Sequence, residues 1–525
     1  MSQFSPSPET DRYAEFIQPV DRYNRDLIDK VRPLDWVNPE PAASYDLVVI
    51  GAGTAGLVVA AGAAGLGLGL KVALIEKNLM GGDCLNVGCV PSKCLIRSSR
   101  AVADILAAAP LGINSVAGID IDFAAVMARM RKIRAEISVH DSADRFRQLG
   151  VDVFFGEARF INSSANDRAI AVGERRLRFK KAVIATGARA TTPKILGLAE
   201  VGYLTNETIF TLSDRPKRLA VIGGGAIGCE LAQAFRRLGC EVTLLHKNSR
   251  LLDREDPDAS EILQQKFTEE GLNVVLDCVI ERVSKTPTGK IISYQQGETL
   301  RDIEVDEILI GVGRSPNVEG LNLEAVGVKY DQQRGVFIDD YLQTSNPYIY
   351  AAGDICMDWK FTHAADTAAR IVIKNTLFSP FGLGRSKLSN LVMPWVTFTD
   401  PEIAHVGLSA NEADKLGLET EQIKIPFSGV DRAIYDGETD GFVKILHQRG
   451  SDRILGATIV ARHAGEMISE ITLAIVAKKG LNQLSSVIHA YPTQADAIKK
   501  AAEAYRKKLL TPRTQAFLKF LAQLS

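Results

Sequence analysis

The feature that most constrains the fold is a glycine-rich strand–turn–helix–strand unit that occurs twice. In the first copy, the apolar, β-branched run Tyr45–Ile50 predicts a buried parallel strand. The turn Gly51–Gly56 follows at once, and an Ala/Gly/Leu-rich helix leads to a second strand, 71–75, that ends at Glu76. A chain with this order folds as a parallel α/β layer rather than as a helix bundle or a sandwich.

Each glycine of the first turn has a physical reason. Gly51 permits the tight turn, Gly53 lets a pyrophosphate approach the backbone, and Gly56 lets the helix pack closely on the strand. The helix N-terminus offers N–H groups and partial positive charge to phosphates, and Glu76 can hydrogen-bond a ribose diol. The unit therefore predicts a dinucleotide site; the alternative is a tight turn without a ligand.

The second copy ends differently. Leu219–Ile222 predicts a strand, a turn with Gly223, Gly225 and Gly228 follows, and a helix over 229–238 leads to a strand over 241–245. The residues after that strand are His246, Lys247 and Arg250, with no carboxylate at the position of Glu76. A 2′-phosphate is repelled by an acid and held by cations, so NADPH is favoured over NADH. The alternative is that Lys247 and Arg250 are ordinary surface charges.

Composition excludes several classes of function. The chain has 525 residues, 46% hydrophobic and 24% charged, so we expect a globular protein with several domains. With 62 basic and 63 acidic residues, nothing indicates a nucleic-acid surface. The uncharged stretch 47–70 is long enough to span a membrane, but its glycines favour strand, turn and buried helix. The polar N-terminus, 1–13, lacks the apolar core of a signal peptide, and a cytoplasmic protein is expected.

Two cysteines follow the first unit, and their spacing is informative. Cys84 and Cys89 lie five positions apart, which in an ideal helix separates Cα atoms by roughly 8–9 Å. A disulfide needs less than about 7 Å. A bridge therefore requires a non-helical segment, for which Asn86, Gly88 and Pro91 supply turn and breaker character.

A redox pair is the preferred interpretation of these thiols. Zinc sites favour shorter Cys spacing with further ligands nearby, so no metal site is expected. The total of seven cysteines is odd and small, which indicates a reducing compartment, where a disulfide is more often catalytic than structural. The remaining cysteines are interpreted as core residues: Cys94, Cys229, Cys240, Cys278 and Cys356.

The chain resembles a known family in four motifs. The stretch GGDCLNVGCVPSK (81–93) resembles the active-site motif of the FAD-dependent pyridine-nucleotide disulfide oxidoreductases, which include dihydrolipoyl dehydrogenase, glutathione reductase and mercuric reductase. AVIATG (182–187), TSNPYIYAAGD (344–354) and PWVTFTDPE (394–402) resemble its later motifs in the same order. The resemblance extends from about Tyr45 to Tyr505.

The resemblance implies an α/β fold with two Rossmann-like dinucleotide-binding domains, one for FAD and one for NAD(P), and a C-terminal α+β dimerisation domain. The implied boundaries are an N-terminal helical extension and linker (1–44), an FAD-binding domain (45–190 and 315–390), an NAD(P)H-binding domain (191–314), an interface domain (391–510) and a helical tail (511–525). A homodimer that shares its active site across the interface is expected.

The resemblance also implies residue roles. Cys89 matches the thiol next to the flavin, Cys84 the thiol that exchanges with substrate, Lys93 a lysine near flavin N5, and Glu230 the acid partner of that lysine. The implied FAD-binding residues are Gly51, Gly53, Gly56, Glu76, Lys77, Gly82, Lys93, Thr186, Gly187, Gly353 and Asp354. The implied NADPH-binding residues are Gly223, Gly225, Gly228, Glu230, His246, Lys247, Arg250 and Gly313.

The chain departs from the family's disulfide-reducing members near its C-terminus. Those members carry a base histidine followed by proline and an acid, whereas here the stretch 489–496 places Tyr491 at the histidine and Asp496 at the acid. His489 matches a different, structural position. Imidazole titrates near neutrality, but a phenol has a reference pKa of about 10 and serves poorly as a base at neutral pH. The alternative is that Tyr491 and His489 are both packing residues.

This departure favours a metal ion or another soft electrophile as the electron acceptor. Tyr491, the segments 431–434 and 441–444, and the segment from Trp395 to Gly407 resemble the mercuric-reductase branch of the family. Against mercury, no vicinal cysteine pair follows Cys356, and no C-x-x-C metal-binding domain precedes the FAD motif. A dihydrolipoyl-dehydrogenase-like disulfide enzyme and a flavin-based redox sensor remain as alternatives.

The ends of the chain carry apolar residues with helical spacing, partly over 9–36 and largely on one face over 513–524. Both segments are expected to dock on the dimer; the alternative is a membrane surface or a partner protein.

Overall fold

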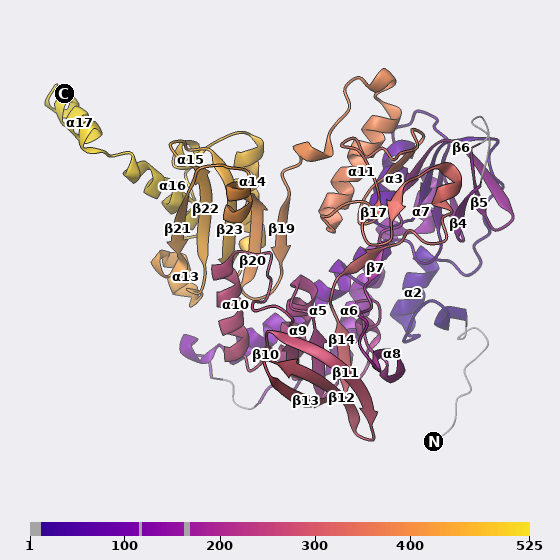
Figure 1. Ribbon diagram of the computed structural model, residues 1–525, viewed down its shortest axis with the longest axis horizontal. Helices are drawn as coiled ribbons and strands as arrows, with labels where there is room; N and C mark the ends of the chain where they lie inside the picture. The colour runs from indigo at the N-terminus through magenta and orange to yellow at the C-terminus, as the bar shows by residue number, and fades with distance from the viewer. Residues whose placement is uncertain (1–11, 115–117, 162–167, 525) are drawn as a thin grey trace. The chain divides into compact units, whose positions relative to one another are not determined.

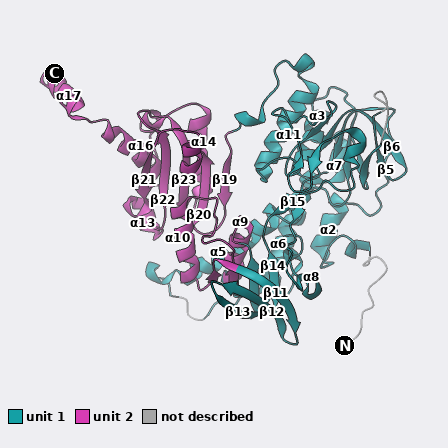
Figure 2. Ribbon diagram, in the orientation of Figure 1, with its two compact units in different colours: residues 1–223, 237–242, 279–391 teal, residues 224–236, 243–278, 392–525 magenta. Residues whose placement is uncertain are grey.

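A computed structural model describes residues 12–114, 118–161 and 168–524. These residues form two compact units, shown in different colours in Figure 2, and each is described on its own. Unit 1 comprises residues 1–223, 237–242 and 279–391, and unit 2 comprises 224–236, 243–278 and 392–525. The expectation about a signal peptide rests on residues 1–13, of which 1–11 lie outside the described part.

Unit 1 is built on a seven-stranded sheet with the order β3-β2-β1-β6-β5-β4 and with β18 paired to β6. Its strands are β1 (Tyr45–Ile50), β2 (Val72–Glu76), β3 (Val151–Phe155), β4 (Ala158–Ile161), β5 (Ala169–Val172), β6 (Arg175–Ile184) and β18 (Ile349–Ala351). The pairs β1–β2, β2–β3, β1–β6 and β6–β18 are parallel, while β4, β5 and the first half of β6 form an antiparallel extension. The β3-β2-β1 order is that of a Rossmann-like layer.

Helices connect and cover the strands of this sheet. They are α2 (Arg22–Val31), α3 (Thr54–Ala64), α4 (Gly82–Asn86), α5 (Cys89–Leu106), α6 (Phe123–Ile137), α7 (Ala143–Gln148) and α11 (Thr362–Leu377). Helix α3 packs on α11, and α6 packs on both α2 and α5 (Figure 1). The carboxyl edge of β1, β2 and β18 is where ligands bind in parallel α/β sheets.

The rest of unit 1 consists of smaller sheets. Strands β8 (Arg218–Ile222) and β14 (Glu307–Ile310) run parallel, β7 (Ala188–Ala190) pairs with β15 (Arg314–Pro316), and β16 (Tyr330–Asp331) pairs with β17 (Gly335–Val336). A three-stranded sheet has the order β11 (Cys278–Thr286), β12 (Gly289–Gln296), β13 (Thr299–Val305).

Unit 2 contains a five-stranded antiparallel sheet with helices packed on it. The sheet order is β19 (Pro394–Thr397), β20 (Glu402–Gly407), β23 (Ile454–Ala461), β22 (Phe442–Gln448), β21 (Thr420–Pro426). The helices of this part are α12 (Ala410–Lys415), α13 (Asp431–Asp436), α14 (Ala464–Val476), α15 (Leu481–Leu484), α16 (Asp496–Lys508) and α17 (Pro512–Leu524). Unit 2 also holds α9 (Ala226–Arg237) up to Arg236, α10 (Pro257–Glu269), and the parallel pair of β9 (Glu241–Leu245), from Thr243 onward, and β10 (Asn273–Val275).

The α/β class and the local elements of both glycine-rich units are confirmed. The predicted strand at Tyr45–Ile50 is β1 with those bounds, and the second unit gives β8, α9 and β9 within three residues of the predicted ranges. The uncharged stretch 47–70 folds as strand, turn and helix, as expected. Within the described residues, no helix combines the length and apolarity that crossing a membrane requires.

Candidate active site

The two thiols lie on either side of a helix break. Helix α4 ends at Asn86, Val87 and Gly88 leave the helical region with φ of −143° and −135°, and α5 begins at Cys89. This confirms the predicted non-helical segment between Cys84 and Cys89. The break brings the Cys84 and Cys89 side chains into hydrogen-bonding contact as thiols.

The surroundings of the pair make its two sulfurs unequal. The hydrogen bond with Cys89 and then burial raise the pKa of the Cys84 thiol, so its proton is held firmly. Cys89 is exposed, is the first residue of the long helix α5, and lies 3.3 Å from the Thr362 hydroxyl oxygen. A helix N-terminus favours negative charge, so Cys89 is the better position for a thiolate and Cys84 for a thiol.

The first glycine-rich turn has the shape that the sequence predicts. Gly51 has a φ of +99°, and a Cβ there would lie 2.4 Å from the Ala185 carbonyl oxygen. A Cβ on Gly56 would lie 1.8 Å from the Gly51 oxygen. A Cβ on Gly82 would lie 2.5 Å from the Gly53 Cα, so the backbone of the thiol loop passes directly over the turn. Only glycine fits these positions, which leaves backbone N–H groups open to a pyrophosphate.

Glu76 ends β2 and closes the turn from the other side. Its carboxylate accepts hydrogen bonds from the backbone N–H of Ala52 and of Asn78, both at 2.7 Å. Burial raises the pKa of Glu76, although the two amides oppose that shift. Lys77 is exposed, and its backbone carbonyl accepts from Arg32 at 3.0 Å.

An arginine that sequence reasoning missed joins two motifs of the predicted FAD site. Arg314 makes an ion pair with Asp83 on α4, and its Nε lies 3.4 Å from Asp354 Oδ2. Burial disfavours the Arg314 cation, but the two carboxylates raise its pKa overall; burial raises the pKa of Asp354. Asp83 and Arg314 lie 231 positions apart, and no spacing in the sequence relates them.

The other FAD-motif residues surround the same strand ends. The Thr186 hydroxyl donates to the Asn317 carbonyl at 2.9 Å, and Gly187 has a φ of +66° with open space at its Cβ position. Gly353, with a φ of +84°, lies against Ala55 and Ala365. This donor set fits FAD: open glycine backbone at the N-terminus of α3, the Glu76 carboxylate at the end of β2, and the half-buried carboxylate of Asp354.

The second glycine-rich turn repeats this arrangement with a different residue. Gly224 donates its backbone N–H to His246 Nδ1 at 3.0 Å, just as Ala52 donates to Glu76 in the first unit. Burial lowers the pKa of His246, and accepting at Nδ1 requires that nitrogen to be unprotonated. His246 therefore supports the turn without a negative charge.

The remaining predicted NADPH residues are placed as follows. Lys247 is exposed, and Arg250 Nη2 donates to the Asp253 carbonyl at 2.9 Å. Gly225 has open space where a Cβ would be, Gly228 is buried on α9, and Gly223 and Gly313 have φ of +115° and +131°.

Glu230 is buried on α9 and accepts from the Phe398 backbone N–H at 2.9 Å. Lys93 lies on α5 in unit 1 and Glu230 in unit 2, so their pairing stays a prediction.

The C-terminal motif forms a cluster that sequence reasoning recognised only in part. The Tyr491 hydroxyl donates to Asp431 Oδ2 at 3.0 Å and lies 3.2 Å from the hydroxyl of Tyr435, which was not predicted. Hydrogen bonds with Tyr435 and Asp431 raise the pKa of Tyr491. Asp496 pairs with Lys500 at 3.3 Å, and His489 pairs with Glu470 at 2.9 Å.

The other cysteines lie where the core interpretation puts them. Cys94, Cys229, Cys240 and Cys278 are buried, and Cys356 is partly buried against the core of unit 1. Within the described ranges, no three or more His, Cys, Asp or Glu side chains gather in a way that could hold a metal ion.

Comparison with known proteins agrees with this geometry. Residues 45–369 match the pyridine nucleotide-disulphide oxidoreductase family, and residues 393–502 match the dimerisation domain of that family. The chain is 34% identical over 487 residues to mercuric reductase from Lysinibacillus sphaericus, covering 93% of this chain and 87% of that protein. It is 34% identical over 469 residues to dihydrolipoyl dehydrogenase from Chlamydia muridarum, covering 87% and 96%.

Solved structures give the same result. The HOCl-induced flavoprotein disulfide reductase RclA from Escherichia coli matches with a TM-score of 0.76 and 26% identity, covering 87% of this chain and 99% of that one. LpdA from Mycobacterium tuberculosis matches with a TM-score of 0.79 and 27% identity, covering 87% and 99%. With both domain matches, the paired thiols and the two glycine-rich turns in place, the chain belongs to the pyridine nucleotide-disulphide oxidoreductase family, whose members depend on FAD and use a pyridine nucleotide.

Proposed function

We propose that the protein is an NADPH-dependent flavoenzyme that passes electrons through FAD to the Cys84–Cys89 pair and on to a thiophilic metal ion or another soft electrophile. The observation that carries this proposal is an intact thiol pair combined with Tyr491 at the position of the base histidine. The proposal includes the domain boundaries expected from the family and a homodimer in the cytoplasm, where the exchanging thiol remains reduced between turnovers.

The sulfurs of Cys84 and Cys89 have different roles in this proposal. FAD, when bound, supplies the two-electron link between the nicotinamide and the disulfide. Cys89, exposed at the N-terminus of α5, holds the negative charge after reduction, while Cys84 keeps its proton until the acceptor binds. With Hg(II) as acceptor, NADPH yields two electrons and a proton, Hg(II) takes both electrons as it becomes metallic mercury, and NADP⁺ leaves.

Tyr491 supports a metal ion over a disulfide. A disulfide acceptor needs a group that takes and returns a thiol proton near neutral pH. The Tyr491 phenol cannot do so, because its pKa is raised by hydrogen bonds with Tyr435 and Asp431. A soft metal ion prefers sulfur ligands and binds the thiol pair directly, so it does not require proton exchange with the cluster of Tyr491, Tyr435 and Asp431. In the proposed homodimer this cluster reaches the thiol pair of the partner subunit.

Four similar proteins add support. The mercuric reductases from Lysinibacillus sphaericus, Staphylococcus aureus and Bacillus cereus are 34–35% identical to this chain, and RclA has been solved as a Cu(II) complex. For the reductant, Lys247 and Arg250 follow β9 where the first unit has Glu76, and His246 keeps the turn uncharged. A 2′-phosphate there finds two cations and no carboxylate at the position of Glu76, although the Asp253 carboxylate lies 3.6 Å from His246 Nε2, and the two cations favour NADPH.

The test is steady-state NADPH oxidation by the purified holoenzyme with Hg(II), Cu(II) and quinones as acceptors. Cys84→Ser and Cys89→Ser are each expected to lower metal-dependent turnover at least 100-fold. Cys94→Ala is the matched control, because Cys94 is buried on the same helix as Cys89 and outside the pair. If Cys84→Ser leaves turnover with every acceptor unchanged, the proposal is wrong.

A disulfide reductase is the second candidate, favoured by the dihydrolipoyl dehydrogenases at 34% identity. This candidate predicts rapid turnover of dihydrolipoamide or a small disulfide. Slow turnover across a panel of such disulfides, with rapid turnover of a metal ion, would remove it.

A further inference from the structure

The N-terminal arm, residues 13–38, packs against its own FAD-type domain. Leu27, Ile28 and Val31 of α2 are fully buried, and α2 packs on α6. Asp21 caps α2 through the N–H groups of Tyr23 and Asn24, and its second oxygen pairs with Arg131 of α6 at 2.6 Å. The arm is therefore a built part of unit 1 rather than a linker.

A chain of buried hydrogen bonds leads from the arm to the thiol loop. Asn24 is fully buried, and its Oδ1 accepts from Arg134 Nη2 at 2.6 Å. The other terminal nitrogen of Arg134 donates to the Asn86 carbonyl, also at 2.6 Å. Asn86 lies two residues after Cys84, and its side-chain amide donates to the carbonyls of Met80 and Gly82. Asn86 thus closes the turn that carries Cys84, and Arg134 holds Asn86.

Arg134 depends on Asn24 because it is nearly fully buried. Burial, with the neighbouring Arg131 cation, lowers the pKa of Arg134 to about 10, so the guanidinium remains charged at neutral pH. A buried cation is tolerated only where acceptors meet its N–H groups. Without the Asn24 oxygen, Arg134 has to turn toward water or another acceptor, and its bond to Asn86 weakens.

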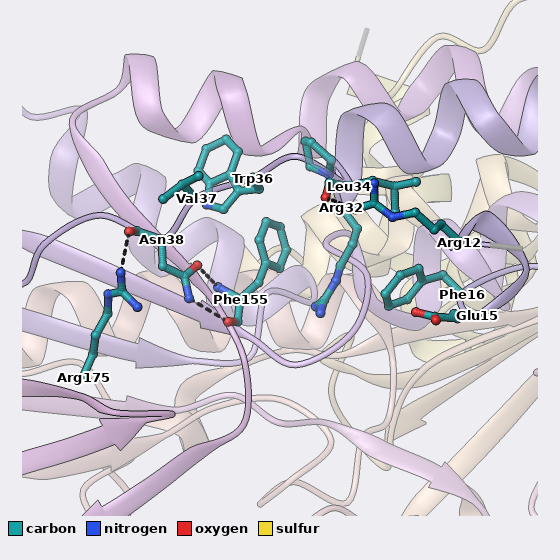
Figure 3. Close-up of a pocket in the computed structure, with 11 residues that line it drawn as sticks. Arg12, Glu15, Phe16, Arg32, Leu34, Trp36, Val37, Asn38, Phe155 and Arg175 are labelled. Atoms are coloured by element: carbon teal, nitrogen blue, oxygen red, sulfur yellow. Dashed lines mark hydrogen bonds between the residues drawn. The ribbon is translucent and has the colours of Figure 1, made fainter. Parts of the chain in front are cut away.

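Further hydrogen bonds hold the arm at the same loop and at the sheet edge. Met80 donates its N–H to the Val31 carbonyl at 3.2 Å, and Arg32 Nη1 donates to the carbonyls of Lys77 and Asn78. In Figure 3, Asn38 bonds with its side chain to both the N–H and the carbonyl of Phe155, each at 2.8 Å. Trp36 Nε1 donates to Val153, so the arm covers the exposed edge of β3.

We propose that the arm positions the thiol loop, with Asn24 and Arg134 as positioning residues that hold the turn in which Cys84 meets Cys89. The chain runs from Asn24 Oδ1 through the Arg134 guanidinium to the Asn86 carbonyl, and loosening it lets Cys84 move away from Cys89. This inference deepens the proposed function, since it rests on the role of Cys84 and Cys89 as the redox pair.

The experiment compares wild-type holoenzyme with Asn24→Leu, which removes the acceptor for Arg134. Hydrogen exchange followed by mass spectrometry should show amides of residues 80–89 exchanging at least fivefold faster, with β1 and β6 unchanged. In dithiothreitol-reduced protein, alkylation of Cys84 by iodoacetamide should be about tenfold faster, since one charge-assisted hydrogen bond is lost. Asn24→Asp keeps an oxygen acceptor for Arg134 but, like Asn24→Leu, loses the hydrogen bond that the Asn24 amide donates to the Pro19 carbonyl, so wild-type rates in this variant would assign the effect to Arg134.

Asp26→Asn is the matched control, because Asp26 is exposed on the same helix and only pairs with Lys30. Unchanged exchange and alkylation in Asn24→Leu would overturn the inference, and so would acceleration spread evenly over the domain. If Asn24→Leu does not fold, Asn24→Ser shortens the side chain beyond reach of Arg134 and is held to the same result. Neither readout requires enzymatic turnover. If the Cys84→Ser test disproved the proposed function, the exchange and alkylation rates would still decide whether the arm positions the thiol loop.

Discussion

At the scale of single residues, the proposed acceptor depends on Tyr491. Its hydroxyl is committed to Asp431 and Tyr435, and those bonds raise its pKa further from neutrality. In the proposed site, the thiol pair therefore has no group at this position that exchanges protons at physiological pH. An acceptor that binds sulfur directly avoids that requirement.

Tyr491→His should convert the site toward disulfide reduction. A histidine titrates near neutral pH, and general acid–base catalysis contributes roughly 10²–10⁴-fold, so turnover of lipoamide should rise at least tenfold. The pH profile of that turnover should gain a limb between about pH 6 and 7. Tyr491→Phe is the control; equal lipoamide turnover in the Phe and His variants would contradict the proton argument.

Arg314 makes charged contacts with two carboxylates, those of Asp83 and Asp354. Arg314→Met should remove the cation that contacts both carboxylates and so lower the free energy of unfolding, although the exposure of Asp83 limits the loss. We expect lower stability in urea and a lower flavin-to-protein absorbance ratio after purification. Arg314→Lys keeps the charge and should lose less of both, whereas a Met variant with full flavin content would show that the pair does not support the site.

At the scale of elements, the two glycine-rich turns use one hydrogen bond with two different acceptors. Glu76 at the end of β2 supports the first turn, and His246 at the end of β9 supports the second. The carboxylate serves a site expected to bind a ribose diol, and the neutral imidazole serves one expected to bind a phosphate. In both turns a backbone N–H donates to a side chain, but that side chain is a carboxylate in the first turn and a neutral imidazole in the second.

The His246 contact makes the second turn sensitive to acid. Burial lowers its pKa below the unfolded value of about 6.5, so below that pH the unfolded chain binds the proton more readily. The contribution of the Gly224–His246 hydrogen bond to the free energy of unfolding is complete above about pH 6.5. It decreases as the pH falls toward the lowered pKa that His246 has in the folded state. The loss in Tm between pH 7.5 and pH 5.5 should be smaller in His246→Asn, which can accept from Gly224 without titrating.

His140→Asn provides the comparison for this measurement, since His140 is exposed. It should show the wild-type dependence of Tm on pH. Identical dependence in the His246 and His140 variants would mean that His246 does not carry the effect.

At the scale of the whole molecule, helix α17 has no buried residue although it carries a row of apolar side chains. Phe517, Leu518, Phe520, Leu521 and Leu524 are all between 43% and 70% exposed. A 13-residue helix is marginal in water on its own, so a packing partner is needed to keep it folded. The helix follows directly on the matched dimerisation domain, which makes a second copy of the chain the expected partner.

Removing residues 511–525 should therefore weaken the dimer. We expect the concentration for half-dissociation in sedimentation velocity to rise at least tenfold, because several apolar side chains lose their cover. Lys519→Ala removes a charge of the same helix and keeps its apolar residues, so it should leave dimerisation unchanged. A truncated chain with wild-type dimer affinity would show that α17 packs elsewhere.

The sequence by itself determined the elements and motifs whose cause is local. The alternation of strand, glycine turn and helix fixes β1, α3 and β2, because positive φ and close backbone approach allow only glycine at Gly51 and Gly56. The helix break between Cys84 and Cys89 was equally predictable, since a bridge at that spacing cannot form within a helix.

Only the tertiary structure decided which distant residues meet around those motifs. Arg314 reaches Asp83, Tyr491 meets Asp431 and Tyr435, and Asn24 binds Arg134, over separations of 56 to 231 positions. Charged and polar side chains are compatible with many surroundings, so their partners are set by the packing of the chain; only for the fully buried Asn24 and the nearly buried Arg134 does burial also make the partner necessary. The motif residues follow from the order of the chain, whereas the groups that hold them follow from how the chain packs.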